Sequence, residues 1–199
     1  MDAYFILGGN VDLTNFEFEN CVVIGVDKGA YLAYLSNIKL DYAIGDFDSI
    51  SKEDLDILKS YTNVIELNPV KDDTDTAYAL RKFKDCENLY MLGGIVGPRI
   101  DHFVANLKLF YEFPNLKIVD NNTMIMECVS GLNFLKDEYK YYSLFALEDV
   151  TNLTLKGFKY PLSNFNLSHQ SGLGVSNEIL DEAYVSFSTG RLLLIKTKE

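Results

Sequence analysis

The chain has 199 residues, a formal net charge of −11 at pH 7, 48% hydrophobic residues and no tryptophan. This length allows one large domain or two small ones with a sizeable core. The acidic balance argues against binding to DNA or RNA, but it leaves small phosphate ligands open where a divalent cation screens them. No apolar run is long enough for a membrane span or a signal peptide, and the three cysteines predict neither disulfides nor a metal site. We therefore expect a cytoplasmic protein that binds no nucleic acid and no membrane.

The first 122 residues alternate short apolar runs with helical patterns. Strands are predicted at 3–7, 21–26, 42–47, 64–67, 89–92 and 116–119, and helices at 30–35, 52–60, 73–83 and 99–111. Continuous apolar strands that alternate with helices predict an α/β fold, a Rossmann-like parallel sheet with helices on both faces. Nearly all the strands end in Gly or Asp, and ligands bind at the carboxyl ends of such strands.

After residue 122 the pattern changes to short alternating runs separated by glycine or proline. The runs lie at 124–129, 141–147, 153–155, 184–187 and 192–195, and no helix is predicted. This pattern indicates an all-β module, a β-sandwich. We therefore predict two domains, residues 1–122 and 123–199, without a long linker between them.

Two carboxylates, Asp46 and Asp48, fall at the end of the apolar run 42–47. Residues two apart in a strand point to the same side, so this pair would repel unless a cation lay between its members. Gly45 would let a phosphate or another backbone come close. The alternative is a turn followed by a serine that caps the next helix.

A second acidic group occupies the segment 71–75, at the start of the third predicted helix. Asp72 and Asp75 are three residues apart and would share one helical face. With Asp46 and Asp48 they would complete an all-oxygen site suited to Mg²⁺, which keeps water and phosphate oxygens as its other ligands. The alternative is that one of these acids caps the helix, because a helix N-terminus favours carboxylates.

A glycine-rich segment, 93–97, follows the fifth predicted strand. Glycines at this place let phosphates approach the backbone and the following helix N-terminus. Arg99 offers a planar fork to phosphate oxygens. Asp101 and His102 fall in the first helical turn, with Asn106 on the face of His102. As alternatives, Asp101 caps this helix and His102 is an ordinary surface or core histidine.

Four motifs, in this order along the chain, resemble those of the thiamine pyrophosphokinase family, and two later segments add to the likeness. They are Gly-Val-Asp-Lys-Gly-Ala at 25–30, Gly-Asp-Phe-Asp-Ser at 45–49, Lys-Asp-Asp-Thr-Asp at 71–75, Arg-Ile-Asp-His at 99–102 with Ala-Asn-Leu at 105–107, and the segments 155–162 and 176–178. The likeness covers nearly the whole chain. Lys28 and Pro98 stand where the family usually has glycine, and these two departures concern the shape of the phosphate-binding loops.

The resemblance implies a homodimer that transfers diphosphate from ATP to thiamine with Mg²⁺ as cofactor, giving thiamine diphosphate and AMP. The N-terminal domain would bind ATP, and thiamine would lie between subunits with the C-terminal domain as part of its site. The implied catalytic and metal-binding residues are Asp46, Asp48, Asp72 and Asp75. The implied ATP contacts are Asp27, Lys28, Lys71, Thr74, Gly94, Arg99 and His102. The implied thiamine contacts are Asp101, Ser176 and Asn177.

Two other functions are compatible with these residues. One is a related Mg²⁺-dependent nucleotide transferase with a different acceptor, and the other is a nucleotide or thiamine sensor without turnover. A sensor has no need of the metal carboxylates, and all four are present, which favours the enzyme. The sequence identifies no general base, and a loose phosphoryl-transfer transition state depends on positioning more than on proton removal.

Overall fold

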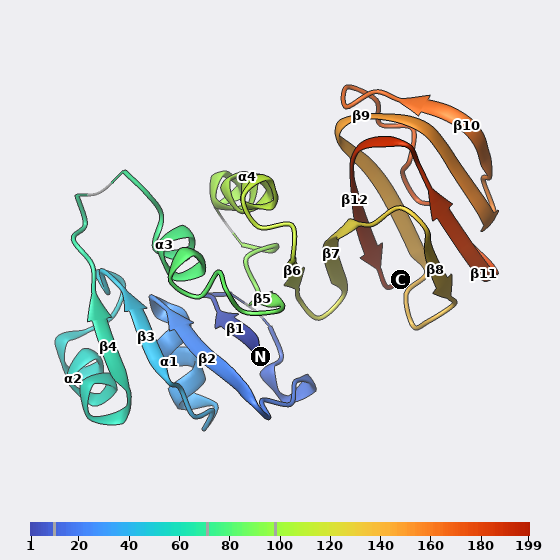
Figure 1. Ribbon diagram of the computed structural model, residues 1–199. Coiled ribbons are helices and arrows are strands. Elements are labelled where there is room, and N and C mark those ends of the chain that lie inside the picture. Colours follow the sequence, from blue (N-terminus) through green and yellow to red (C-terminus); the bar gives the residue numbers. More distant parts are fainter. Residues whose placement is uncertain (10, 71, 98) are drawn as a thin grey trace. The chain divides into compact units, whose positions relative to one another are not determined.

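The structure is a computed structural model that describes residues 1–9, 11–70, 72–97 and 99–199. The chain divides into two compact units, Met1–Asn121 and Asn122–Glu199 (Figure 1). No helix among the described residues is both long enough and apolar enough to pass through a bilayer.

The first unit consists of parallel strands and helices. Its strands are β1 (Asp2–Ile6), β2 (Cys21–Val26), β3 (Tyr42–Gly45), β4 (Asn63–Glu66), β5 (Leu89–Leu92) and β6 (Leu116–Val119). Its helices are α1 (Lys28–Leu35), α2 (Lys52–Tyr61), α3 (Asp75–Lys82) and α4 (Ile100–Lys108), with short 3-10 turns η1 (Leu13–Asn15) and η2 (Leu109–Tyr111). The strands lie side by side in the order β4-β3-β2-β1-β5-β6, and every neighbouring pair is parallel.

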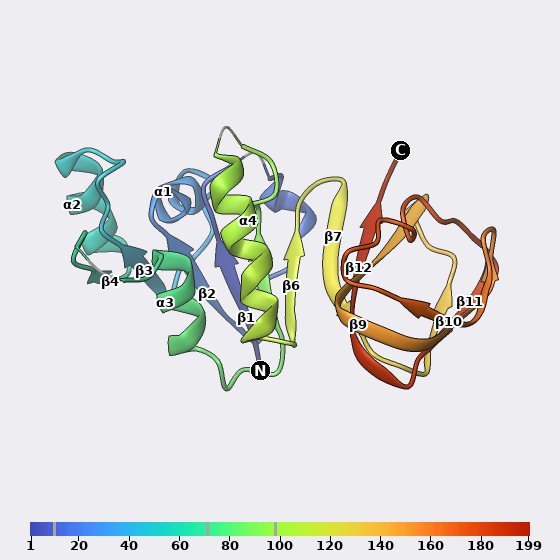
Figure 2. The ribbon, with the colours of Figure 1, turned by 90° about the horizontal axis from the view of Figure 1, so that it is seen from above.

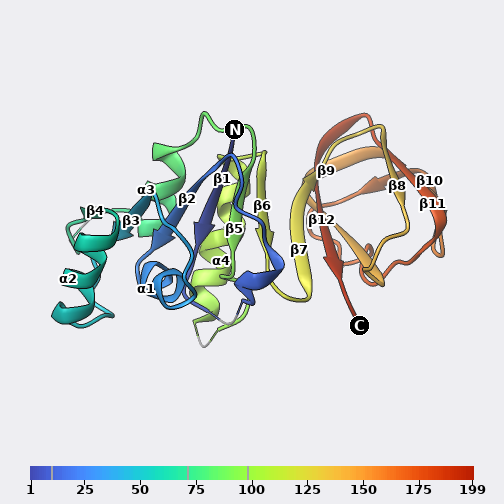
Figure 3. The same ribbon diagram turned by 90° about the horizontal axis from the view of Figure 1, so that it is seen from below.

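Helices cover both faces of this sheet. Figures 2 and 3 show α1 and α2 on one face and α3 and α4 on the other. Many apolar side chains of the central strands are completely buried, among them Phe5, Ile24, Ile44 and Met91. Strands that are buried on both faces are continuous apolar runs in the sequence. For this reason the predicted ranges of β2, β5 and β6 agree with the structure at both ends.

The strand β3 ends at Gly45, two residues earlier than the sequence predicted. Phe47 has a φ of 54°, in the left-handed region, and its side chain is buried. The backbone N–H of Asp48 donates to Oδ1 of Asp46 at 3.2 Å, a bond typical of turns. Ser51 then caps α2. The strand predicted at 42–47 therefore ends before both carboxylates, and the alternative of a turn followed by a capping serine is confirmed.

The helix α3 begins at Asp75, and Thr74 is its N-cap. The Thr74 hydroxyl oxygen accepts the backbone N–H of Ala77 at 3.1 Å. Two expectations from the sequence are corrected by this. No acid caps the helix, and Asp72 and Asp75 do not share a helical face, because Asp72 precedes the helix.

The second unit is built from antiparallel strands. They are β7 (Thr123–Cys128), β8 (Leu132–Leu135), β9 (Tyr141–Phe158), β10 (Leu162–Leu167), β11 (Ile179–Ser186) and β12 (Thr189–Thr197). Their order is β7-β12-β9-β11-β8, and β10 also pairs with β9. Within the described residues 123–199 no helix forms, as the sequence predicted.

The long strand β9 joins two runs, 141–147 and 153–155, that were predicted as separate strands. Its first part pairs with β12, and its second part pairs with β10 and β11. Asn152, with a φ of 55°, marks the change of partners. The sequence prediction failed here because the chain changes partners without leaving the strand. It also missed β8 and β10, because β10 is mostly exposed, half of the four residues of β8 are exposed, and neither strand contains a continuous apolar run.

Candidate active site

Three carboxylates meet at the carboxyl ends of β2 and β3. Asp27 follows β2, Asp46 follows β3 and Asp75 is the first residue of α3. One ligand oxygen from each lies within 4.8 Å of the other two, and all three residues are partly buried. We call these three residues the acid group. Like charges so close together raise the energy of the ionised state unless a cation offsets their repulsion.

Asp27 combines an unusual backbone conformation with a buried carboxylate oxygen. Its backbone has a φ of 47° and a ψ of −125°, a conformation that costs energy for a residue with a side chain. Its Oδ1 is buried and has no hydrogen-bond partner among the described residues. Burial, followed by the negative charges of Asp75 and Asp46, raises the pKa of Asp27 to about 7. The unpartnered oxygen and the all-oxygen donor set fit a hard cation such as Mg²⁺.

Gly45 makes room for the Asp27 carboxylate. A Cβ at Gly45 would lie 1.9 Å from Oδ1 of Asp27 and 2.8 Å from its Cγ. No side chain can occupy that space while Asp27 keeps its place, since real Cβ contacts are essentially never this short. The glycine is therefore required by the acid group itself.

A cavity of about 510 Å³ opens beside the acid group, where β1, β2 and β5 end. The strand order changes direction between β1 and β5, and α/β sheets bind ligands at such switch points. The volume is within the usual range for small-molecule sites. Five of the seven residues predicted to contact ATP line it, and they are Asp27, Lys28, Gly94, Arg99 and His102. The sequence did not identify the apolar lining residues Leu7, Val26, Ile95 and Val96.

Of the other two residues predicted for ATP, Thr74 does not line this cavity. Thr74 uses its hydroxyl to cap α3, and Lys71 lies outside the described residues. Pro98, one of the two departures from the expected glycines, also lies outside them. Lys28, the other departure, is the exposed first residue of α1 and adds a positive charge to the cavity lining.

Arg99 and Asp101 form a two-pronged ion pair at the start of α4. Nε of Arg99 donates to Oδ1 of Asp101 at 2.9 Å, and Nη2 donates to Oδ2 at 2.6 Å. The hydrogen bonds from Arg99 lower the pKa of Asp101 to about 2, so this carboxylate is ionised at neutral pH. It does not cap α4, for which no side-chain cap is formed. Both side chains are more than half exposed and open to a ligand.

Asn106 fixes the glycine turn on the far side of the cavity. It is buried, and its Nδ2 donates to the backbone oxygen of Gly94 at 3.2 Å. Gly94 has a φ of 80°, and a Cβ there would lie 2.7 Å from a methyl group of Leu7. Asn106 and His102 both line the cavity, as their helical spacing predicts.

The second unit has its own cavity, of about 480 Å³, lined by Ser176, Asn177 and mostly apolar residues. Ser176 is exposed, whereas Asn177 is buried. The Asn177 side-chain oxygen accepts the backbone N–H groups of Tyr160 and Glu178, both at 3.0 Å. Its amide nitrogen donates to the backbone oxygen of Tyr160 at 2.9 Å. The Asn177 side chain therefore holds local backbone together, while Ser176 faces the solvent.

Known proteins resemble this chain over almost its full length. Residues 14–120 match the family model "Thiamin pyrophosphokinase, catalytic domain", and residues 131–194 match "Thiamin pyrophosphokinase, vitamin B1 binding domain". The thiamine pyrophosphokinase of Bacillus subtilis is 35% identical over 201 residues, which cover 94% of this chain and 92% of that protein. The chain belongs to the thiamine pyrophosphokinase family.

Solved structures of the thiamine pyrophosphokinase family have the same fold. The crystal structure of the Bacillus subtilis protein covers the whole of both chains with a TM-score of 0.89 and 31% identity. A family protein from Enterococcus faecalis also covers the whole of both chains, with a TM-score of 0.85 and 28% identity. The catalytic-domain match contains the acid group and most of the cavity lining, and the vitamin B1 match contains the Ser176 segment.

The structure changes the composition of the acid group expected for a thiamine pyrophosphokinase family member. It brings Asp46 and Asp75 together, as the sequence predicted, and adds Asp27. Asp48 and Asp72 are exposed and do not belong to the group. The sequence signal for Asp27 was its place directly after an apolar run, whereas the structure alone shows that this strand lies next to β3 and that Gly45 leaves space for the carboxylate.

Proposed function

We propose that the chain transfers diphosphate from ATP to thiamine and releases AMP. The observation that carries the proposal is the acid group beside the switch-point cavity, in a chain of this family. A purely structural set of acids would not need a buried carboxylate oxygen without a partner, which Asp27 has within the described part of the chain.

The two units support different parts of this function. We assign residues 1–122 to a Rossmann-like ATP-binding domain, since the sheet is parallel and the cavity lies at its switch point. We assign residues 123–199 to a thiamine-binding β-sandwich. Support comes from the two sets of partners of β9 and from the core they share, which includes Tyr142, Leu153 and Val185.

Asp27, Asp46 and Asp75 would hold Mg²⁺, and Asp48 and Asp72 remain proposed contributors. Bound Mg²⁺ supplies positive charge that offsets the phosphate charge during transfer.

The chain's other residues would bind and orient the substrates. Arg99 would grip phosphate oxygens with its fork, and Lys28 would add positive charge beside them. Gly94, where a Cβ would collide with Leu7 and Asn106, would let phosphates approach the backbone of this turn. The apolar lining residues would exclude water and pack on the nucleotide. Asp101, freed from Arg99 by the phosphates, would attract the cationic thiamine, with Ser176 of a second subunit in a homodimer completing that site.

The direct test is to incubate the protein with thiamine, ATP and Mg²⁺ and to measure thiamine diphosphate and AMP. We expect equal amounts of the two products and none after chelation of the metal. Asp27→Asn, Asp46→Asn and Asp75→Asn should each lower turnover at least about tenfold, or about 1.4 kcal/mol of barrier. Asp56→Asn, an exposed position on α2, serves as the matched control.

Three results would contradict the proposal. Stoichiometric ADP with thiamine monophosphate would show transfer of a single phosphate. Product with another acceptor in place of thiamine would show a related transferase. Tight binding of ATP and thiamine without product would show a sensor.

A further inference from the structure

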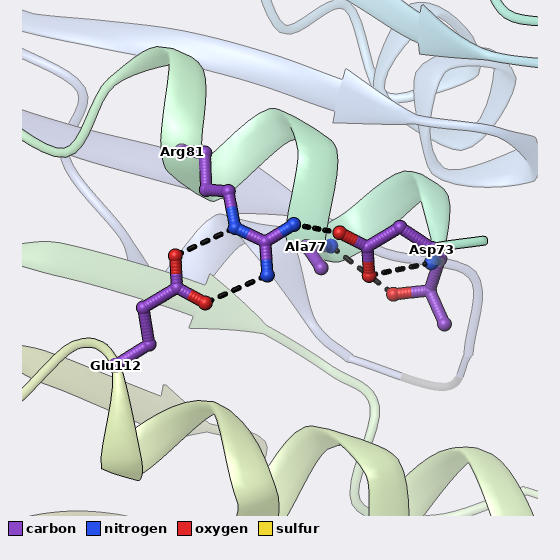
Figure 4. Close-up of polar contacts among 5 residues, drawn as sticks. Asp73, Ala77, Arg81 and Glu112 are labelled. Carbon is purple, nitrogen blue, oxygen red and sulfur yellow. Dashed lines mark hydrogen bonds and ion pairs between the residues drawn. The ribbon is translucent and has the colours of Figure 1, made fainter. Parts of the chain in front are cut away.

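Arg81, near the C-terminal end of α3, links two segments of the first unit (Figure 4). Its Nε donates to Oε1 of Glu112 at 2.6 Å, and its Nη2 donates to Oε2 at 2.7 Å. Its Nη1 forms an ion pair with Asp73. Figure 4 shows the guanidinium between the two carboxylates. A guanidinium held between two carboxylates through its three nitrogens fixes direction as well as distance.

The Asp73 end of this link leads to the acid group. Asp73 lies two residues before Asp75, and its Oδ1 accepts the backbone N–H of Thr74 at 3.0 Å. Thr74 in turn caps α3 through the backbone N–H of Ala77. Arg81 therefore holds the segment that determines where α3 starts, and with it the place of the Asp75 carboxylate.

The Glu112 end leads to the other wall of the cavity. Glu112 closes η2, which continues directly from α4, and its backbone N–H donates to the oxygen of Leu109 at 3.0 Å. The helix α4 carries His102 and Asn106 of the cavity lining. The fork thus connects the two helices that lie on the same face of the sheet and border the site.

Arg81 itself does not line the cavity and does not belong to the acid group. It lies six residues after Asp75, which is about 9 Å along a helix axis. The three side chains of the link are between 35% and 47% exposed, and ion pairs with this much solvent contribute little to overall stability. We therefore expect Arg81 to act locally. The carboxylates of the acid group repel one another, and this repulsion tends to displace the first turn of α3, to which Arg81 is linked through Asp73.

We propose that Arg81 is a positioning residue that acts through Asp73 and holds Asp75 in place for Mg²⁺-bound nucleotide. This inference rests on the proposed function, because it concerns the same acid group. Outer contacts that orient the ligands of a metal are the known means by which proteins tune metal affinity.

The test is a calorimetric titration with Mg²⁺ and α,β-methylene-ATP, an analogue that resists cleavage at the bond broken in diphosphate transfer. We expect Arg81→Gln to weaken binding roughly tenfold, the lower end of the usual cost of losing an outer-shell partner. Arg81→Lys keeps the positive charge but loses the planar fork, so its affinity for the analogue should lie between those of the wild-type protein and Arg81→Gln. The double variant Asp73→Asn with Arg81→Gln should bind no more weakly than Arg81→Gln, because both changes break one link.

The matched control is Arg191→Gln in the second unit. Nε and Nη2 of Arg191 donate to the two carboxylate oxygens of Glu127 at 2.9 and 2.5 Å, a fork of the same type. This control should leave nucleotide affinity unchanged. In turnover assays Arg81→Gln should raise KM for Mg²⁺-ATP and leave kcat nearly unchanged, the pattern of lost ground-state binding.

Wild-type affinity in Arg81→Gln, or an equal loss in Arg191→Gln, would overturn the inference and leave the proposed function intact. A double variant much weaker than Arg81→Gln would show that Arg81 does not act through Asp73. If the wild-type protein does not bind the analogue, the proposed function fails and the inference fails with it. Should Arg81→Gln not fold, Glu112→Gln removes one side of the link and carries the same expectation.

Discussion

Asn177 and Ser176 are neighbours that the family resemblance groups together, yet the structure predicts opposite effects for their alanine variants. Asn177 is 4% exposed, and its side chain makes three hydrogen bonds to the backbone of Tyr160 and Glu178. The Ser176 hydroxyl makes no hydrogen bond within the described part of the chain, and Ser176 is exposed on the same cavity. We expect Asn177→Ala to reduce stability and Ser176→Ala to reduce thiamine affinity.

The size of the first effect follows from the contacts. Each hydrogen bond contributes about 1 kcal/mol net, so the three bonds of Asn177 predict a loss of about 3 kcal/mol. For a chain of this size that loss corresponds to a fall in Tm of about 6–12 °C. Ser176→Ala, a surface change, should alter stability by less than about 0.5 kcal/mol.

Thermal unfolding and calorimetric titration with thiamine, on both variants, check these expectations. The titration is carried out below the unfolding transition of the less stable variant, so that both proteins are folded. An Asn177→Ala protein with wild-type Tm and abolished thiamine binding would refute the reasoning. It would mean that the Asn177 amide serves the ligand and not the backbone.

Two further predictions concern a glycine and a carboxylate. Gly45→Ala should weaken Mg²⁺-dependent binding of α,β-methylene-ATP at least about tenfold, because the new Cβ would displace the Asp27 carboxylate. Wild-type affinity in the same titration would exclude Asp27 as a ligand of the metal. Burial raises the pKa of Asp137, but hydrogen bonds from Lys196 and Tyr142 outweigh it and leave that pKa below 3.8. The Asp137 contribution to stability is therefore complete above about pH 4 and is lost as the pH falls through the lowered pKa. Asp137→Asn should lower Tm at pH 7 and flatten its decline below about pH 4, and an unchanged acid decline in thermal melts would contradict this.

The elements of the first unit could largely be predicted from the sequence. Strands such as β2, β5 and β6 are buried on both faces, so burial leaves a continuous apolar run that needs no knowledge of neighbours. The second unit was harder. The strands β8 and β10 are buried on one side at most and leave no such run. The strand β9 stays one strand because two different sets of partners continue its pairing.

The acidic residues of the site show where local reasoning stops. The sequence by itself determined that carboxylates collect at strand ends and that Asp46 and Asp75 are among them. Only the tertiary structure decided that Asp27 joins them and that Asp48 and Asp72 do not. Which carboxylates meet depends on which strands are neighbours and on the residue at which each strand or helix ends. Those ends are determined by packing between distant segments, as where the Asp27 carboxylate fills the space beside Gly45, and a local pattern does not contain that information.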